Sequence, residues 1–144
     1  MTRTQLAYYS GFVRGITEAI SDNAFRSPSS MSTRVFKKDD LEKGLAKELK
    51  CGEEDIVLEK SALSLSDYLK LELGWDTENA WNLGRRLGFV IGKPEALYTI
   101  KDDGELRDNY SGFSRGGGPF YFVEDLFIAE YKELAVLFIV GNDE

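Results

Sequence analysis

The chain has 144 residues, 42% of them apolar and 30% charged, which is typical of one globular domain over residues 1–144. It contains no histidine, which excludes Ser-His and Cys-His nucleophile systems and the usual zinc and non-haem iron sites. Its single cysteine excludes a disulfide within the chain, and no series of acidic residues resembles a calcium loop, so no cofactor or metal is expected.

The apolar runs and the N-terminal segment indicate where the protein resides. No apolar run approaches the roughly 18–20 residues that a membrane span requires. The sequence MTRTQLAYYSG at residues 1–11 lacks the apolar centre of a signal peptide. We therefore expect a cytoplasmic protein without a membrane segment.

The first predicted element is a helix over residues 4–22. Its apolar residues recur at helical spacing, and they are Leu6, Tyr9, Val13, Ile16 and Ile20. Small residues four apart form another face of the same helix, and they are Ala7, Gly11, Gly15 and Ala19. The segment 23–33 is polar and contains Pro28, so it predicts a loop.

Three helices and one short strand are predicted between residues 39 and 91. The first helix covers 39–50, and the run Ile56-Val57-Leu58 then predicts a strand. The next two helices cover about 66–73 and 77–91. Their ends are set by caps and breakers, namely Ser64 or Ser66, Gly74, Asp76 or Thr77, and Gly92 with Pro94.

After Pro94 the sequence is typical of strands. A strand at 96–100 enters a turn at 101–104, and residues 105–119 predict a polar, glycine-rich loop. The apolar segments 120–131 and 134–141 predict an antiparallel hairpin at the centre of a sheet. Because LAVLFIV has no polar side, both of its faces should be covered. This order predicts an α+β fold, with the N-terminal and central helices packed on one face of a C-terminal antiparallel sheet.

The sequence GFVIGKPEAL at residues 88–97 repeats much of GFVRGITEAI at residues 11–20. Both lie on predicted helices with small residues four apart, and such a face lets another backbone approach closely. We interpret the similarity as packing, because repeat arrays generally need three or more units. Four glycines should then be buried at close contacts, namely Gly11, Gly15, Gly84 and Gly88. Leucine at Gly15 or Gly84 should destabilise the fold by at least about 1–3 kcal/mol.

Two glycine-rich segments bear some similarity to phosphate-binding loops. GFVIGKP at 88–94 has three residues between its glycines, where a P-loop has four, and it ends a helix instead of beginning one. SGFSRGGGPF at 111–120 precedes a strand, so no helix dipole would assist an anion. The second segment predicts a connecting loop, and the alternative is a binding loop that uses Phe113 and Arg115.

Residues 67–89 have the outline of a helix-turn-helix. The second helix begins with Asp76 and Glu78, whose charge would oppose DNA, so nucleic-acid binding is the weaker alternative. The carboxylate pair Asp102 and Asp103 falls in a predicted turn. The other pair, Glu124 and Asp125, should point to opposite faces of a strand. Neither pair predicts two catalytic carboxyls across a cleft, so both are expected to be surface charge.

The charge distribution suggests a function in binding. Net charge is −7, and residues 120–144 carry six acidic residues against Lys132, a balance of −5. We expect a non-enzymatic protein that binds another, basic protein, such as an acidic inhibitor or immunity-type protein. The expected partner-binding residues are Phe113, Arg115, Glu124, Asp125, Glu130 and Glu133. The alternatives are a small enzyme or ligand-binding protein with a pocket between sheet and helices, and a nucleic-acid-binding regulator that uses residues 67–89.

Overall fold

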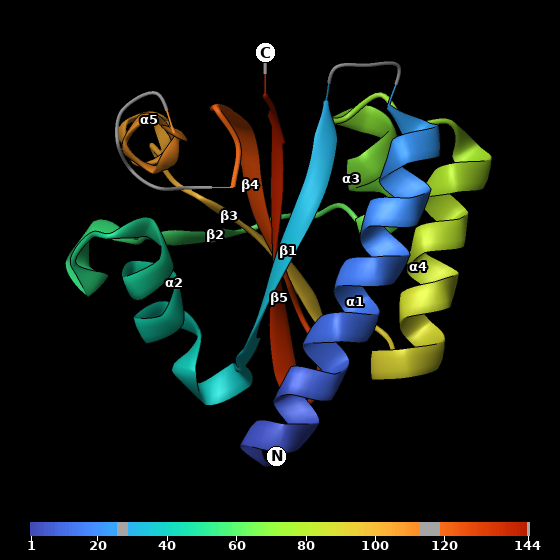
Figure 1. The fold of residues 1–144 in the computed structure, drawn as a ribbon, viewed down its shortest axis with the longest axis horizontal. Coiled ribbons are helices and arrows are strands. Elements are labelled where there is room, and N and C mark those ends of the chain that lie inside the picture. Colours follow the sequence, from blue (N-terminus) through green and yellow to red (C-terminus); the bar gives the residue numbers. More distant parts are fainter. Residues whose placement is uncertain (26–28, 113–118, 144) are drawn as a thin grey trace.

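The structure is a computed structural model that describes residues 1–25, 29–112 and 119–143. The described residues form five α-helices and a five-stranded antiparallel sheet in the order β1-β5-β4-β3-β2 (Figure 1). The helices are α1 (Arg3–Ala24), α2 (Leu41–Leu49), α3 (Leu65–Leu71), α4 (Thr77–Ile91) and α5 (Gly104–Tyr110). The strands are β1 (Ser30–Lys37), β2 (Leu58–Lys60), β3 (Ala96–Ile100), β4 (Phe122–Glu130) and β5 (Leu134–Asn142). The predicted α+β class is confirmed.

The hairpin of β4 and β5 lies inside the sheet, as the sequence predicted. β5 pairs with β1 on one side and β4 on the other, and Phe127 lies opposite Phe138 in the hairpin register. Every residue of β5 from Leu134 to Gly141 is buried. A strand without a polar side is stable only where both faces of the sheet are covered.

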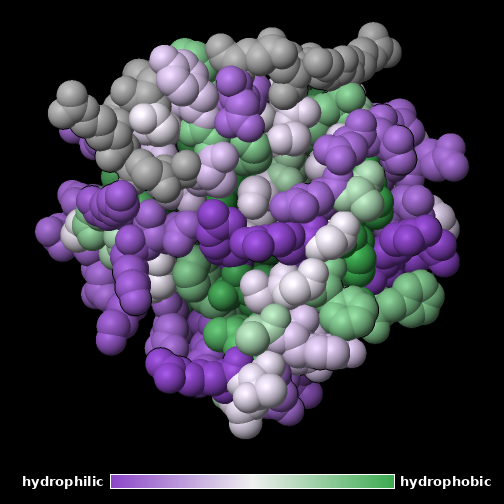
Figure 2. Space-filling model, in the orientation of Figure 1, coloured by the Kyte–Doolittle hydropathy of each residue, from purple (hydrophilic) through white to green (hydrophobic). Residues whose placement is uncertain are grey.

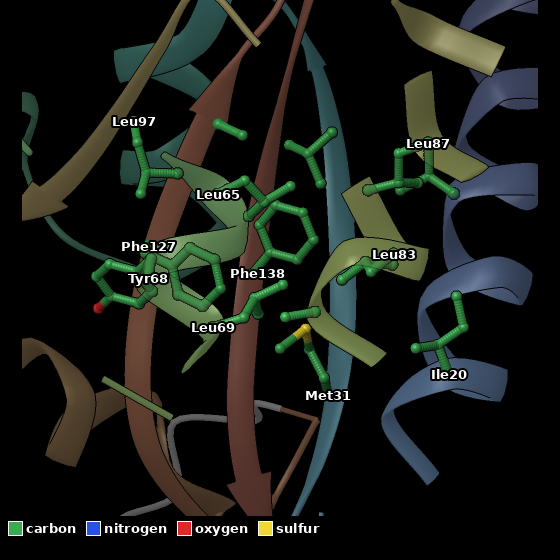
Figure 3. Packing of buried hydrophobic residues seen from close by; sticks show 14 of the residues in the cluster. Ile20, Met31, Leu65, Tyr68, Leu69, Leu83, Leu87, Leu97, Phe127 and Phe138 are labelled. Atoms are coloured by element: carbon green, nitrogen blue, oxygen red, sulfur yellow. The ribbon is translucent and has the colours of Figure 1, made fainter. Parts of the chain in front are cut away.

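Helices cover both faces of the sheet, so the expectation of helices on one face is wrong. α1, α3 and α4 lie on one face, and α2 and α5 lie on the other (Figure 1). Alternate residues of β5 explain this arrangement, because Phe138 belongs to the first core cluster whereas Leu137 and Ile139 belong to the second. Figure 3 shows the first cluster, in which Leu83 of α4 faces the phenylalanines of the hairpin.

The predicted helix ends are confirmed at several caps. The Ser64 hydroxyl accepts a hydrogen bond from the Asp67 amide, and the Asp76 carboxylate accepts one from the Asn79 amide, each at 3.1 Å. Gly74 has a φ of 72°, a conformation that favours glycine after a helix. These signals are local in the sequence, which is why they could be read from it.

Two elements were not predicted. The predicted loop 23–33 contains the start of β1, where Ser32 and Thr33 are buried, and the predicted loop 105–119 contains α5. Serine and threonine give β1 little apolar patterning, so its pairing with β5 decides its conformation. α5 buries only Leu106 and Tyr110 along its seven residues, which leaves a weak helical pattern.

The first of the two similar sequences lies on α1 and the second begins in the last turn of α4, but their glycines do not form the contact between these helices. α1 and α4 pack against each other, and their buried residues are Val13, Thr17, Ile20, Ser21, Ala80, Leu83 and Leu87. Gly11 and Gly15 are exposed, and a Cβ atom at either position would meet nothing within 4 Å. The expectation that these glycines are buried at close contacts is therefore wrong.

We predict that Gly15→Ala stabilises the protein. The added methyl group meets open space, and alanine replaces glycine inside a helix, which raises the free energy of unfolding by about 0.5–1 kcal/mol. Gly44→Ala on α2 is the opposing control, because its Cβ would overlap the Phe36 ring and should lower stability. Urea denaturation measures both changes, and a lower midpoint for Gly15→Ala would contradict the assignment of an open helix face.

None of the helices in the described part of the chain combines the length and apolar content that a membrane span needs.

Candidate ligand-binding pocket

A pocket opens between α4, the segment 60–66 that joins β2 to α3, and the start of β3. Its volume is about 670 Å³, within the range of sites that take small molecules. The aliphatic part of its lining consists of Ala62, Leu63, Leu65, Pro94, Ala96 and Leu97. The pocket thus lies between the helical layer and the sheet, as the small-ligand alternative requires.

The pocket exists because α4 carries glycine where it faces segment 60–66. Gly84 and Gly88 line the pocket, and a Cβ atom at Gly88 would meet nothing within 4 Å. A Cβ atom at Gly84 would meet only the Ser66 hydroxyl, at 3.3 Å. The side-chain-poor face predicted for α4 is therefore real, but it lines a hollow instead of a helix contact.

Three cationic side chains line the pocket, and they come from three parts of the chain. Lys60 ends β2, Arg85 lies on α4 and Lys93 follows α4. Among the described residues, neither lysine forms an ion pair or hydrogen bond through its side chain. The one acidic residue of the lining, Glu95, accepts a hydrogen bond from Lys38 Nζ at 2.8 Å. The lining therefore has an excess of positive charge in a chain whose net charge is −7.

The ring of Trp81 lines the pocket, and Phe89 lies on the other side of Arg85, outside the lining. The Arg85 guanidinium carbon lies 4.9 Å from the ring centroid of Trp81 and 5.7 Å from that of Phe89. Both rings are exposed, Trp81 by 57% and Phe89 by 79%. Figure 2 shows apolar side chains, in green, at the surface on the side formed by α1 and α4. Such cation–π contacts hold a guanidinium near an apolar surface.

Serine hydroxyls supply neutral polar groups to the pocket. Ser61 Oγ accepts a hydrogen bond from the Leu63 amide and Ser64 Oγ accepts one from the Asp67 amide, both at 3.1 Å. A hydroxyl that accepts a backbone bond still has its own proton to donate. These two groups can therefore donate to an acceptor atom of a ligand.

A second, polar hollow of about 430 Å³ lies where β4 begins. A β-bulge between Val123 and Asp125 shifts the register of β4 against β5. The bulge lets Glu124 and Asp125 line the same hollow, so the expectation that they point to opposite faces is wrong. Asp103 lines it too and accepts a hydrogen bond from Arg107 Nε at 3.2 Å. The expectation that carboxylates do not converge is corrected at this point.

Asp125 accepts two hydrogen bonds beside this hollow. The Tyr68 hydroxyl donates a hydrogen bond to Asp125 Oδ2 at 2.7 Å, and the Leu126 amide donates to Oδ1 at 2.9 Å. Burial raises the pKa of Asp125 above its ordinary value, and the negative charge of Asp103 adds to this effect, while both hydrogen bonds oppose it. Burial and the Asp125 charge also raise the pKa of Tyr68, so its hydroxyl remains a donor. Among the described residues, no group of acids or cysteines is arranged to hold a metal ion.

This raised pKa predicts a pH dependence of stability. The folded protein binds the Asp125 proton more tightly than the unfolded chain does. The contribution of Asp125 to the free energy of unfolding should therefore fall as pH rises from about 4 through the raised pKa. We compare wild type with Asp125→Asn by urea denaturation between about pH 4 and pH 8. The stability of wild type minus that of the variant should decrease with pH, and an increase would contradict the assignment.

The structure does not gather into one surface the four expected partner-binding residues that it describes. Glu124 and Asp125 lie at one end of β4, and Glu130 lies at the other, about 20 Å away along the strand. Glu130 lies 3.8 Å from Lys38, and the exposed Glu133 follows in the hairpin turn. The remaining two expected residues, Phe113 and Arg115, lie outside the described residues.

Comparison with known proteins adds no assignment. No family model, no curated protein and no solved structure matches the chain.

Only some of the residues around the pocket could be predicted from the sequence to lie together. Trp81, Arg85 and Phe89 recur four apart, which a helix places on one exposed stripe, and this pattern could have been read from the sequence. Lys60 ends β2 and Lys93 lies between α4 and β3, and their approach to α4 depends on how β2 and β3 pair. No local pattern marks that approach.

Proposed function

We propose that this protein binds a small organic molecule in the pocket between α4, segment 60–66 and β3, without catalysing a reaction. The observation that carries the proposal is the hollow over Gly84 and Gly88, which is lined by apolar side chains and is large enough for a small ligand. A sequence without histidine lacks the residue that serves most often as a general base, which supports binding over catalysis.

Binding of another, basic protein is a second proposal, supported by the other end of the molecule. Tyr121 is exposed by 49% and Phe122 by 43%, and both precede the exposed Glu124. Exposed aromatic residues beside a charged residue fit the composition of protein interfaces. Because Glu130 and Glu133 lie far from this end, the surface proposed for a partner is smaller than the one expected from the sequence.

The pocket proposal is tested by filling the hollow. We expect the uncharged fluorescent probe N-phenyl-1-naphthylamine to bind wild type at one saturable site. Gly88→Leu should weaken binding by about tenfold or more, because the leucine side chain occupies the space that the probe requires. The variant should also be at least as stable as wild type, since leucine has the higher helix propensity and a Cβ atom at position 88 meets nothing within 4 Å.

Gly11→Leu is the matched control for this test. The same substitution there lies on the exposed face of α1, in a shallow apolar groove formed with Tyr8 and Phe12, and should leave probe binding unchanged. Unchanged binding in Gly88→Leu, or loss in Gly11→Leu alone, would overturn the proposed site.

A further inference from the structure

We infer that the ligand of this pocket is a small organic anion, with an apolar body and a carboxylate, sulfonate or phosphate group. This inference rests on the proposed function. The apolar body would lie over Gly84 and Gly88, and the anionic group would lie toward Lys60 and Lys93.

The charges of the lining carry the inference. Lys60, Arg85 and Lys93 oppose a single carboxylate, that of Glu95, and Lys38 already holds that carboxylate at 2.8 Å. The two lysines have no acidic partner among the described residues. In an acidic protein, unpaired cations around one apolar hollow favour an anion and disfavour a cation of the same shape.

Hydrogen-bond donors beside the cations point to the same chemistry. The hydroxyls of Ser61 and Ser64 accept from backbone amides, so each has its proton left to donate. An oxyanion accepts several such bonds at once, and its bonds to charged donors are the stronger ones. With a neutral apolar molecule in the pocket, these hydroxyls would donate only to water, and the lysine charges would not contribute to binding.

A pair of probes with one scaffold separates the charge from the apolar contact. 8-Anilinonaphthalene-1-sulfonate differs from N-phenyl-1-naphthylamine only by its sulfonate group. We expect the sulfonate probe to bind wild type about tenfold more tightly at low salt, the combined effect of two or three exposed ion pairs. The preference should shrink as the salt concentration rises.

The double variant Lys60→Gln/Lys93→Gln should abolish most of that preference and leave the affinity for the neutral probe unchanged. Lys43→Gln/Lys47→Gln, which removes two exposed cations of α2, is the charge-matched control and should change neither affinity. Filling the pocket by Gly88→Leu should weaken binding of both probes.

The possible failures are distinguishable. Two results would overturn the inference of an anionic ligand and leave the pocket as a site for a neutral molecule. One is equal affinity of wild type for the two probes, and the other is a preference for the sulfonate probe that persists in Lys60→Gln/Lys93→Gln. If neither probe bound wild type, or if Gly88→Leu did not change the binding, the proposed function would be overturned, and so would the inference of an anionic ligand.

Discussion

Phe138→Ala is expected to lower the free energy of unfolding by about 3–5 kcal/mol. Phe138 is fully buried on β5, the strand that pairs on both sides. Its ring stacks on Phe127, with centroids 4.8 Å apart and planes 10° apart, and Figure 3 shows the two rings between the sheet and the helices. Removing the ring leaves a cavity under α3 and α4 that the tightly paired hairpin cannot close.

Phe89→Ala is the control for this prediction, since it removes the same side chain from a position that is 79% exposed. It should change stability by about 0.5 kcal/mol or less. Urea denaturation of both variants, with unchanged m-values, makes the comparison. If Phe138→Ala lowered the free energy of unfolding no more than Phe89→Ala does, the packing of Phe138 on Phe127 would not stabilise the core.

Glu48→Ala is expected to lower the free energy of unfolding by about 2–3 kcal/mol. Glu48 on α2 joins two other elements, because its Oε1 accepts from Arg34 Nε of β1 at 2.7 Å and from the Tyr110 hydroxyl of α5 at 2.6 Å. Tyr110 is 2% exposed, so its hydroxyl would be left without a partner in an apolar layer. Arg34 and Glu48 are about one quarter exposed, which keeps the cost below that of a fully buried pair.

Two further variants distinguish the contact from a general effect on α2. Glu48→Gln keeps an acceptor oxygen and should recover part of the loss, whereas Glu42→Ala removes an exposed acid of the same helix and should change little. If Glu48→Ala and Glu42→Ala were equally stable, the three-residue contact would contribute nothing measurable.

Local signals account for what the sequence predicted well. The caps at Ser64 and Asp76 and the apolar run of β5 each lie within a few neighbouring residues, and each cap is one of the two alternatives that the sequence offered. β1 was missed because pairing with a strand about 100 residues away decides its conformation. The bulge at Glu124 is a property of two strands together, so the orientation of Glu124 relative to Asp125 could not be predicted from β4 alone.

The glycines of α4 lie in a local pattern whose surroundings are set by distant residues. The spacing of Gly84 and Gly88 correctly predicted a helix face without side chains, but it could not show what lies opposite that face. We expected another helix or the sheet to pack on this face, and the structure has a pocket there. The outcome depends on how far segment 60–66 lies from α4, which is set by β2 pairing with β3 and by the packing of α3 on α4.

The most direct test of the account maps the amide resonances that move when 8-anilinonaphthalene-1-sulfonate is added to the isotope-labelled protein. We expect the shifted amides to lie in residues 60–66, 84–88 and 93–97, and Gly88→Leu to abolish these shifts. Shifts confined to residues 103–107 and 124–125, which line the polar hollow, would contradict it, as would a spectrum that the probe leaves unchanged.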